Sequence, residues 1–248
     1  MIQNSDKLLN KRILVTGGTA GLGAHLAIEI AKCGGIPIVL GRDQEKLNSL
    51  ILQFESFNLA LPQFHLFDLT ELDQMTAFVD ELNEVDGLIL SAGVNDKTTV
   101  KFISSKKIDK IFDINFTAQV QLIQQLIKKK KFKKGASVLG ISSLSAGYIS
   151  ATNSLYSASK SALEQFLKTL ALEHAPEIRV NIIRPGLLNS KMASAYDFSE
   201  NIDEFINQVP MKRMGEFSDI HPLALMLLSD ESSWMTGAVI PIDGGTSI

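Results

Sequence analysis

The chain has 248 residues, of which 45% are hydrophobic and 21% charged, and its formal net charge is −3. This length suits one large α/β domain with a sizeable core. The slightly acidic balance gives no general affinity for nucleic acid or for anionic membranes. No run approaches the ~18 apolar residues that a membrane-spanning helix needs, and the N-terminus lacks the apolar core of a signal peptide. We therefore expect a cytoplasmic protein with no membrane or nucleic-acid partner.

The cysteine and histidine residues argue against a disulfide and against a metal site. Cys33 is the only cysteine, so an internal disulfide is excluded and an intracellular location is favoured. It falls among apolar residues of an expected helix, which is typical of an inert, packed thiol. The four histidines are scattered along the chain without the spacing of metal ligands, and we predict no metal site: His25, His65, His174 and His221.

Apolar strands and amphipathic helices alternate along the chain. Strands are expected at 12–16, 36–40, 64–67, 87–90 and 136–141, and helices at 22–33, 44–57, 70–79 and from 154 onward. Short glycine-rich connections separate them, and no repeat or linker divides the chain. The pattern predicts a single α/β domain over residues 1–248, a Rossmann-type doubly wound parallel sheet of about seven strands with helices on both faces.

A run of lysines at 128–134, interrupted by Phe132, is the only dense charge patch. A nucleic-acid site needs a broad basic face with stacking aromatic residues, which this run does not supply. We interpret the run as the end of a long helix before Gly135, where cations complement the negative end of the helix dipole. A remaining alternative is that Lys133 and Lys134 meet an acidic partner.

The segment 16–23 joins the first expected strand to the first helix and is rich in glycine. Gly17, Gly21 and Gly23 give the spacing G-x-x-x-G-x-G, with Thr19 and Leu22 between them. Glycine lets the backbone turn sharply and approach a phosphate, which the helix N-terminus then stabilises. No Gly-Lys-Ser/Thr follows, so the segment is not a P-loop. It predicts dinucleotide binding.

The end of the second strand bears on which dinucleotide is bound. A fold that prefers NAD usually places a carboxylate here for the adenosine ribose, but this chain has Gly41 followed by Arg42. Arginine can bind a 2′-phosphate, so NADP(H) is favoured over NAD(H). Alternatively, Asp43 reaches the ribose or caps the next helix. Asp68, which closes the third strand, is expected to bind the adenine amino group or to serve as a turn residue.

Tyr156 and Lys160 lie one turn apart on an expected helix that follows the strand 136–141 and its two closing serines, Ser142 and Ser143. A phenol beside a fixed positive charge is suited to acid–base catalysis, because the charge favours the phenolate. Alone, a Tyr-x-x-x-Lys pair is more often an exposed helical pair. The glycine-rich segment upstream favours the catalytic interpretation.

Together these residues resemble the short-chain dehydrogenase/reductase family over essentially the whole chain. The resemblance rests on the glycine segment, Asp68, Ala92-Gly93, Asn115, Ser143, Tyr156-x-x-x-Lys160, Asn181, Pro185-Gly186 and a closing segment with Arg213-Met214-Gly215-Glu216, Thr236-Gly237 and Asp243-Gly244-Gly245. Ser143 precedes Tyr156 by thirteen residues, as the family pattern expects, which selects it over Ser142. The closing segment is most similar to that of 3-oxoacyl-[acyl-carrier-protein] reductases.

The resemblance implies hydride transfer between a nicotinamide cofactor and a carbonyl or secondary alcohol. It implies four catalytic residues: Asn115, Ser143, Tyr156 and Lys160. Asn115 would hold a water that links Lys160 to solvent, or it is a satisfied amide of the core. The implied cofactor contacts are Gly17, Thr19, Gly21, Leu22, Gly23, Arg42, Asp68, Leu69, Ser91, Ala92, Gly93, Tyr156, Lys160, Pro185, Gly186, Leu188 and Ser190. The chain departs from the family at Leu90-Ser91, which replace Asn-Asn, and at Ser190, which replaces threonine.

The substrate is expected to lie under a loop at about 187–214. This segment contains Met192, Tyr196, Phe198, Ile202, Phe205, Ile206 and Met211, which either close over an apolar substrate or pack as an ordinary amphipathic helix. A 3-oxoacyl thioester, small or carried by an acidic acyl carrier protein that meets Lys133 and Lys134, is the first expectation. The alternatives are a sugar, polyol or steroid alcohol dehydrogenase and a non-catalytic dinucleotide-binding scaffold. The family resemblance implies a homotetramer, with a dimer as the alternative.

Overall fold

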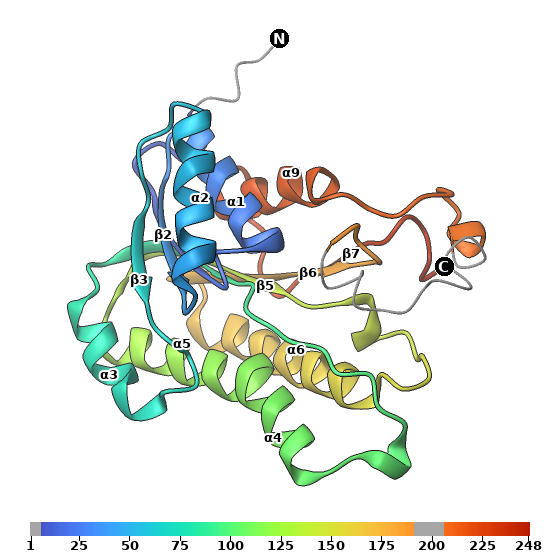
Figure 1. The fold of residues 1–248 in the computed structure, drawn as a ribbon. Coiled ribbons are helices and arrows are strands. Elements are labelled where there is room, and N and C mark those ends of the chain that lie inside the picture. The colour runs from blue at the N-terminus through green and yellow to red at the C-terminus, as the bar shows by residue number, and fades with distance from the viewer. Residues whose placement is uncertain (1–5, 191–205) are drawn as a thin grey trace.

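In the computed structural model, which describes residues 6–190 and 206–248, seven parallel strands form one sheet (Figure 1). The strand order is β3-β2-β1-β4-β5-β6-β7, and it reverses between β1 and β4. The strands are β1 (Arg12–Thr16), β2 (Ile36–Gly41), β3 (Gln63–Leu66), β4 (Val85–Leu90), β5 (Phe132–Ile141), β6 (Ile178–Pro185) and β7 (Val239–Ile242). This arrangement confirms the predicted Rossmann-type, doubly wound α/β fold.

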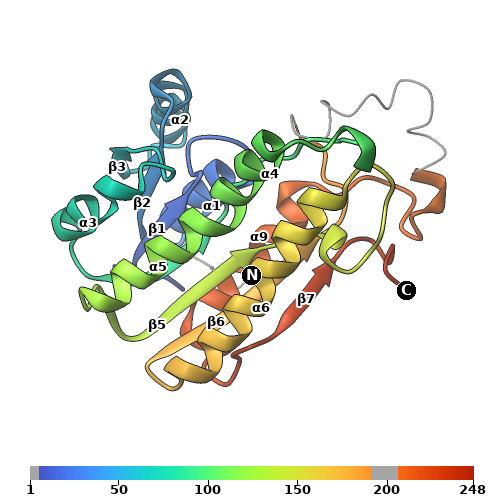
Figure 2. The same ribbon diagram turned by 90° about the horizontal axis from the view of Figure 1, so that it is seen from below.

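Helices cover both faces of the sheet (Figures 1 and 2). One face carries α1 (Gly21–Lys32), α2 (Gln44–Ser56) and α9 (Phe217–Leu228), and the other carries α3 (Leu72–Glu81), α4 (Ser105–Phe112), α5 (Ala118–Lys128) and α6 (Ser154–His174). Successive strand residues point to opposite faces. Accordingly, Leu14 packs with the core under α3, α5 and α6, whereas Ile13 and Val15 pack with α1 and α9.

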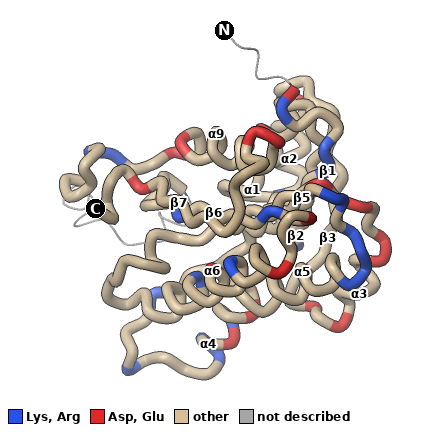
Figure 3. The backbone as a smooth tube through the Cα atoms, turned by 180° about the vertical axis from the view of Figure 1, so that it is seen from behind, with Lys and Arg blue, Asp and Glu red and all other residues tan. Residues whose placement is uncertain are grey.

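The lysine run does not end a long helix, so that prediction is wrong. Helix α5 ends at Lys128, and β5 begins at Phe132, so Lys133 and Lys134 belong to the strand. The reason is long-range pairing: Phe132 is opposite Val85 in the sheet, and the Lys131 backbone carbonyl accepts a hydrogen bond from the Val85 amide at 2.7 Å. The run lies beside acidic residues of neighbouring elements (Figure 3).

The position of the run also removes it from the mouth of the expected site. Lys133 binds Asp86 Oδ2 at 2.9 Å near the amino end of β5. Ser142 and Ser143 follow the carboxyl end of the same strand, roughly 25 Å away at the rise of an extended chain. The expectation that Lys133 and Lys134 receive an acidic carrier protein at the site mouth is therefore wrong.

A π-helical turn at Asp113–Thr117 separates α4 from α5. Such turns add a residue to the helical ladder and are often found at functional sites. Here the turn contains Asn115, which is completely buried. Among the described residues, no helix is long and apolar enough to cross a membrane.

Candidate active site

A cleft of about 1460 Å³ lies at the carboxyl ends of the central strands, where the strand order reverses. Ligands of doubly wound sheets bind at this place. Most of the predicted cofactor residues line the cleft, namely Gly17, Thr19, Gly21, Leu22, Ser91, Ala92, Gly93, Tyr156, Lys160, Pro185, Gly186, Leu188 and Ser190. The predicted catalytic Ser143 lines it as well. The fold thus brings the glycine segment and the Tyr-x-x-x-Lys pair to one cavity.

The glycine segment has the geometry of a phosphate cradle. Gly17 has a φ of +63°, and a Cβ there would lie 2.8 Å from the Ala92 Cα atom. A Cβ at Gly23 would lie 2.5 Å from the Gly17 carbonyl oxygen, so Gly23 supports the turn from below rather than lining the cleft. Helix α1 begins at Gly21 with no acidic residue in its first turn. Free N–H groups and a positive helix end at this place fit the pyrophosphate of a dinucleotide.

Gly23→Ala should weaken dinucleotide binding roughly tenfold or more, because the added methyl group displaces the Gly17 carbonyl and with it the cradle. The dissociation constant of NADPH, measured by quenching of protein fluorescence, checks this. Ala24→Gly in the same helix is the matched control, since it costs about 1 kcal/mol of helix stability without adding an atom. Equal affinities of Gly23→Ala and the wild type would contradict this account of the cradle.

Strand β2 ends with Gly41, where a fold that prefers NAD usually has a carboxylate. A Cβ at Gly41 would lie 2.5 Å from Thr19 Cγ2, so the Thr19 side chain fills the space beside it. Arg42 Nη1 donates a hydrogen bond to Asp68 Oδ2 at 2.8 Å, and neither residue lines the cleft. Burial opposes ionisation of Asp68, but hydrogen bonds from Arg42 and Thr70 outweigh it and hold its pKa below the ordinary value.

The two remaining predictions at this end of the sheet are also placed by the structure. Asp43 caps α2, because its Oδ1 accepts hydrogen bonds from the backbone of Glu45 and Lys46, each at 3.1 Å. This is the capping alternative rather than the ribose contact. The Leu69 side chain is buried in the core, so only its backbone is available to a cofactor.

The Leu90-Ser91 departure is accommodated by Thr16 and by Gln119, of which the sequence did not single out Gln119. Leu90 is fully buried in the apolar core. The Thr16 hydroxyl accepts hydrogen bonds from the backbone N–H groups of Ser91 (3.0 Å) and Ala92 (3.1 Å). Gln119 Nε2 donates to the Ala92 carbonyl at 3.0 Å. Thr16 and Gln119 therefore hold the end of β4, although no asparagine is present there.

Lys160 is buried beneath the cleft, with 3% of its surface exposed. Its Nζ donates to the Ile141 carbonyl at 2.9 Å and lies 5.9 Å from the centre of the Tyr156 ring. Burial lowers the pKa of Lys160 to about 8, and the negative charge of Glu164 opposes this shift. A Cβ at Gly93 would lie 3.3 Å from Lys160 Nζ, which explains the glycine at the cleft wall.

Asn115 lies behind Gly93, with its side-chain amide engaged inside the protein. Its Oδ1 accepts from the Val94 amide at 2.8 Å, and its Nδ2 donates to the Val94 carbonyl (2.9 Å) and to Ser159 Oγ (3.0 Å). Both amide hydrogens are thus used, as in the satisfied-amide alternative. The amide fixes the segment that contains Gly93, and a water held by Asn115 would have to use its backbone carbonyl.

The two serines after β5 differ in their hydrogen bonds. Ser142 Oγ donates to the buried Glu164 carboxylate at 2.6 Å, so its hydrogen is engaged. Ser143 Oγ instead accepts from the Ser145 amide at 3.1 Å, which leaves the hydroxyl hydrogen to be donated elsewhere. This geometry favours Ser143 as the hydrogen-bond donor to a substrate, in agreement with the thirteen-residue spacing.

Ser143→Ala should lower kcat by a factor on the order of 10², the effect of removing one hydrogen-bond donor to a developing oxyanion. Ser142→Ala, the matched control, should retain most of the turnover and lower the stability by about 1–3 kcal/mol through the loss of a buried partner of Glu164. Steady-state kinetics and denaturant unfolding of both variants test this. The reverse pattern would assign the role to Ser142.

An ion pair between a partly exposed arginine and a buried glutamate supports this end of the sheet, and sequence reasoning missed it. Arg184 donates to Glu164 through Nε (2.7 Å to Oε1) and Nη2 (2.5 Å to Oε2), in a bidentate pair. Glu164, which is one turn after Lys160 on α6, is 1% exposed. The pair links α6 to β6 beneath Ser142. The only signal in the sequence was the spacing of Tyr156, Lys160 and Glu164 on one helical face.

The expected substrate loop is described only in part. Its apolar residues Met192, Tyr196, Phe198, Ile202 and Phe205 lie outside the described residues. Before that gap, Pro185 to Ser190 line the cleft. After it, Val209 and Met211 line a smaller neighbouring pocket of about 240 Å³.

The fold and the cleft define a dinucleotide-binding α/β protein of the doubly wound class. A family model described as Enoyl-(Acyl carrier protein) reductase matches residues 17–247. A 3alpha-hydroxysteroid dehydrogenase of Mediterraneibacter gnavus is 31% identical over 243 residues, covering 96% of this chain and 97% of the relative. The chain belongs to the short-chain dehydrogenase/reductase family and is an oxidoreductase.

One further similarity bears on the subfamily and another on the fold. A 3-oxoacyl-[acyl-carrier-protein] reductase of Chlamydia muridarum is 28% identical over 244 residues, covering 96% of this chain and 98% of the relative. The solved structure of a short-chain dehydrogenase/reductase of Brucella melitensis, of the glucose/ribitol dehydrogenase type, aligns with a TM-score of 0.89 at 24% identity over 98% of this chain and 99% of the other. The 3-oxoacyl reductase likeness is therefore present, but it does not exceed the likeness to the steroid enzyme.

Proposed function

We propose that this protein is an NADP(H)-dependent enzyme that interconverts a ketone and a secondary alcohol. The observation that carries the proposal is the meeting of Ser143, Tyr156 and the buried Lys160 with the glycine cradle in a single cleft. A Cβ at Gly17 or Gly23 would collide with backbone atoms, so glycine is needed for the tight turn between β1 and α1. This turn leaves backbone N–H groups at the start of α1 to bind a dinucleotide phosphate. When bound, the nicotinamide cofactor supplies the hydride acceptor and donor.

In carbonyl reduction, negative charge develops on the substrate oxygen as the carbon is reduced. The Tyr156 phenol donates its proton to this oxygen, and the Ser143 hydroxyl donates a hydrogen bond to the same atom. Ser143 is oriented for this donation because its hydroxyl oxygen accepts a hydrogen bond from the Ser145 amide. In alcohol oxidation the same groups act in reverse, with Tyr156 accepting the proton.

Lys160 supports Tyr156 electrostatically. An ammonium group has three N–H donors, one of which is directed to the Ile141 carbonyl. Its positive charge, held in a buried site 5.9 Å from the Tyr156 ring centre, stabilises the phenolate that forms after proton donation. Asn115 completes this arrangement by fixing the segment of Gly93, against which Lys160 lies. We propose that a water on the Asn115 backbone carries protons between Lys160 and solvent.

Two substrate classes are candidates. A 3-oxoacyl thioester is supported by the likeness to the 3-oxoacyl reductase. The family model, described as Enoyl-(Acyl carrier protein) reductase, supports a substrate bound to an acyl carrier protein without specifying a ketone. A hydroxysteroid is supported by the 31% identical relative of that name. A screen of NADPH oxidation over acetoacetyl thioesters, oxosteroids, sugars and diketones, with NADH in parallel, distinguishes them. The absence of turnover with every carbonyl in the screen would favour a non-catalytic scaffold.

The preference for NADP(H) rests on Gly41 and Arg42. Thr19 fills the place beside Gly41, so no carboxylate there repels a 2′-phosphate. The Arg42 side chain is 61% exposed, and beside the Nη1 bond to Asp68 its guanidinium has further N–H donors for a phosphate. Arg42→Ala should raise KM for NADPH roughly tenfold or more and leave KM for NADH almost unchanged. Arg12→Ala, at the amino end of β1 and outside the cleft lining, is the charge-matched control. A parallel rise of both KM values would contradict the assignment.

We also propose that the protein assembles as a homotetramer. Large apolar side chains are exposed on its surface, among them Leu172 (85%) on α6 and Trp234 (99%) before β7. Contiguous exposed apolar patches mark contact surfaces between proteins, and these two side chains are candidate members of such patches; the tetramer itself is what the family resemblance implies. Light scattering coupled to size exclusion measures the assembly, and a monomer at micromolar concentration would contradict it.

A further inference from the structure

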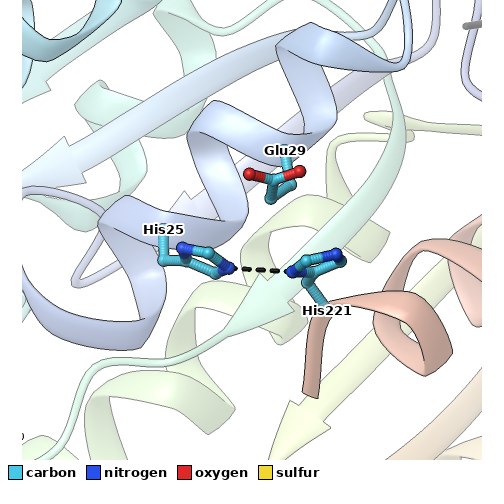
Figure 4. A group of neighbouring side chains, drawn as sticks. All are labelled: His25, Glu29 and His221. Carbon is cyan, nitrogen blue, oxygen red and sulfur yellow. Dashed lines mark hydrogen bonds between the residues drawn. The ribbon is translucent and has the colours of Figure 1, made fainter. Parts of the chain in front are cut away.

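Two histidines that lie far apart in the sequence meet in space, next to a glutamate. His25 and Glu29 are four residues apart on α1, and His221 lies on α9, which packs against α1. His25 Nε2 and His221 Nδ1 are 2.9 Å apart (Figure 4). Candidate ligand atoms of the three side chains all lie within 4.8 Å of one another. The two histidines are 196 residues apart in the sequence, so their spacing gave no sign of this contact.

We propose that His25, Glu29 and His221 form a binding site for a divalent transition-metal ion, of which Zn²⁺ is the best match. Two imidazoles and one carboxylate are a donor set that Zn²⁺ favours, whereas Mg²⁺ and Ca²⁺ prefer oxygen ligands alone. With three protein ligands, the fourth coordination position of the ion is open to water. The three side chains are all partly exposed, so an ion can reach them from solvent.

The separation of the nitrogens agrees with this assignment after a small adjustment. Two nitrogens on a tetrahedral zinc ion lie about 3.4 Å apart, given bonds of 2.0–2.1 Å. His25 and His221 need to separate by only about half an ångström from their 2.9 Å contact. A hydrogen bond between two ring nitrogens also requires that one of them is unprotonated, as a metal ligand must be.

Lys32 is the group that competes with an ion at this site. Its Nζ binds Glu29 Oε1 at 2.8 Å and lies 4.2 Å from the centre of the Phe57 ring. The Lys32 side chain is 37% exposed, and a surface ion pair of this kind contributes little to stability. Glu29 retains its second oxygen for a metal ion, so ion binding does not require that the pair breaks.

A metal ion in this place would join two elements with different roles. Helix α1 carries the glycine cradle at its N-terminus, and His25 lies one turn beyond Gly21. Helix α9 follows the segment that ends with Gly215, which forms a bridge to Leu188 at the cleft. The ion would tie the cofactor end to the base of the substrate segment, and it would stabilise the folded chain by binding it in preference to the unfolded one.

The test is a calorimetric titration with Zn²⁺. The sample is the purified full chain without a tag, from which a chelator has removed any bound metal. We expect one equivalent to bind per chain and Tm to rise by about 5 °C or more at a hundredfold excess over Kd. Titration with Co²⁺ should give a visible absorption band from the nitrogen ligands. His25→Ala and His221→Ala should each weaken binding at least ~100-fold, and Glu29→Gln at least ~10-fold.

His174→Ala and Glu173→Gln, at the end of α6, are the matched controls and should bind as the wild type does. Tm without metal shows whether each variant is folded, and His25→Gln and His221→Asn replace the alanine variants if those do not fold. The absence of stoichiometric binding to the wild type would overturn the proposal. Equal affinities of the wild type and the folded His25 and His221 variants would overturn it as well.

Discussion

Tyr156→Phe should lower kcat for carbonyl reduction by roughly 10²–10⁴-fold, the usual contribution of a well-placed general acid. The substitution removes one hydroxyl group from a side chain that is 8% exposed, so the ring continues to fill its place. The glycine cradle is untouched, and the affinity for NADPH should therefore stay close to that of the wild type. Single-turnover kinetics and NADPH titration of the variant measure the two effects separately.

Tyr148→Phe is the matched control for this prediction. Tyr148 also lines the cleft, but it is 48% exposed and has no lysine one turn further along a helix. It should keep its kcat. If Tyr156→Phe turned over within a few-fold of the wild type, the proton donor would have to be another group. If it lost NADPH binding as well, the effect would be structural.

Lys160→Met should lower kcat on the order of 10³-fold, because Tyr156 loses the positive charge that stabilises its phenolate. The methionine side chain has a similar length and fits an apolar site without a charge. Thr169→Val, on an exposed part of the same helix, is a control for changes in α6 itself. A Lys160→Met variant with undiminished turnover would remove Lys160 from the catalytic group.

The same variant changes the pH dependence of stability in a defined direction. Because the folded-state pKa of Lys160 is about 8, below the ordinary lysine value of 10.5, the unfolded chain binds more protons between these pH values. The free energy of unfolding of the wild type should therefore rise with pH in this window, relative to Lys160→Met. From pH 7 to 9.5 the difference is about 2 kcal/mol. Denaturant unfolding of the two proteins at both pH values measures this difference. If the free energy of unfolding changed by the same amount in the wild type and in Lys160→Met, the lysine would not have a lowered pKa in the folded state.

The sheet and the helices could be predicted from the sequence because their signals are local. The period of apolar residues located β1, β2 and the start of α6 to within a residue or two, and the glycines after β1 predicted the turn into α1. The lysine run was misplaced because its local composition suits a helix end, whereas Phe132 enters the sheet opposite Val85. Pairing with a distant strand leaves no periodic pattern within a short segment.

The candidate site divides in the same way. The spacing of Ser143, Tyr156 and Lys160 was visible because their elements are adjacent in the chain. The Glu164–Arg184 pair and the contact of His25 with His221 depend on packing between distant elements, and neither gives a motif. The π-turn that directs Asn115 inward is also a tertiary feature. It interrupts a helix whose apolar pattern continues on both sides.

Transfer of deuterium from NADPH labelled at C4 tests the central claim most directly. The wild type, incubated with the best carbonyl substrate of the screen and with each of the two C4-deuterated forms, should give an alcohol labelled at the carbinol carbon from one form only. Tyr156→Phe should bind the labelled cofactor and yield almost no labelled alcohol. If NADPH bound in the cleft but no carbonyl compound received deuterium from either form, the protein would not be a carbonyl reductase.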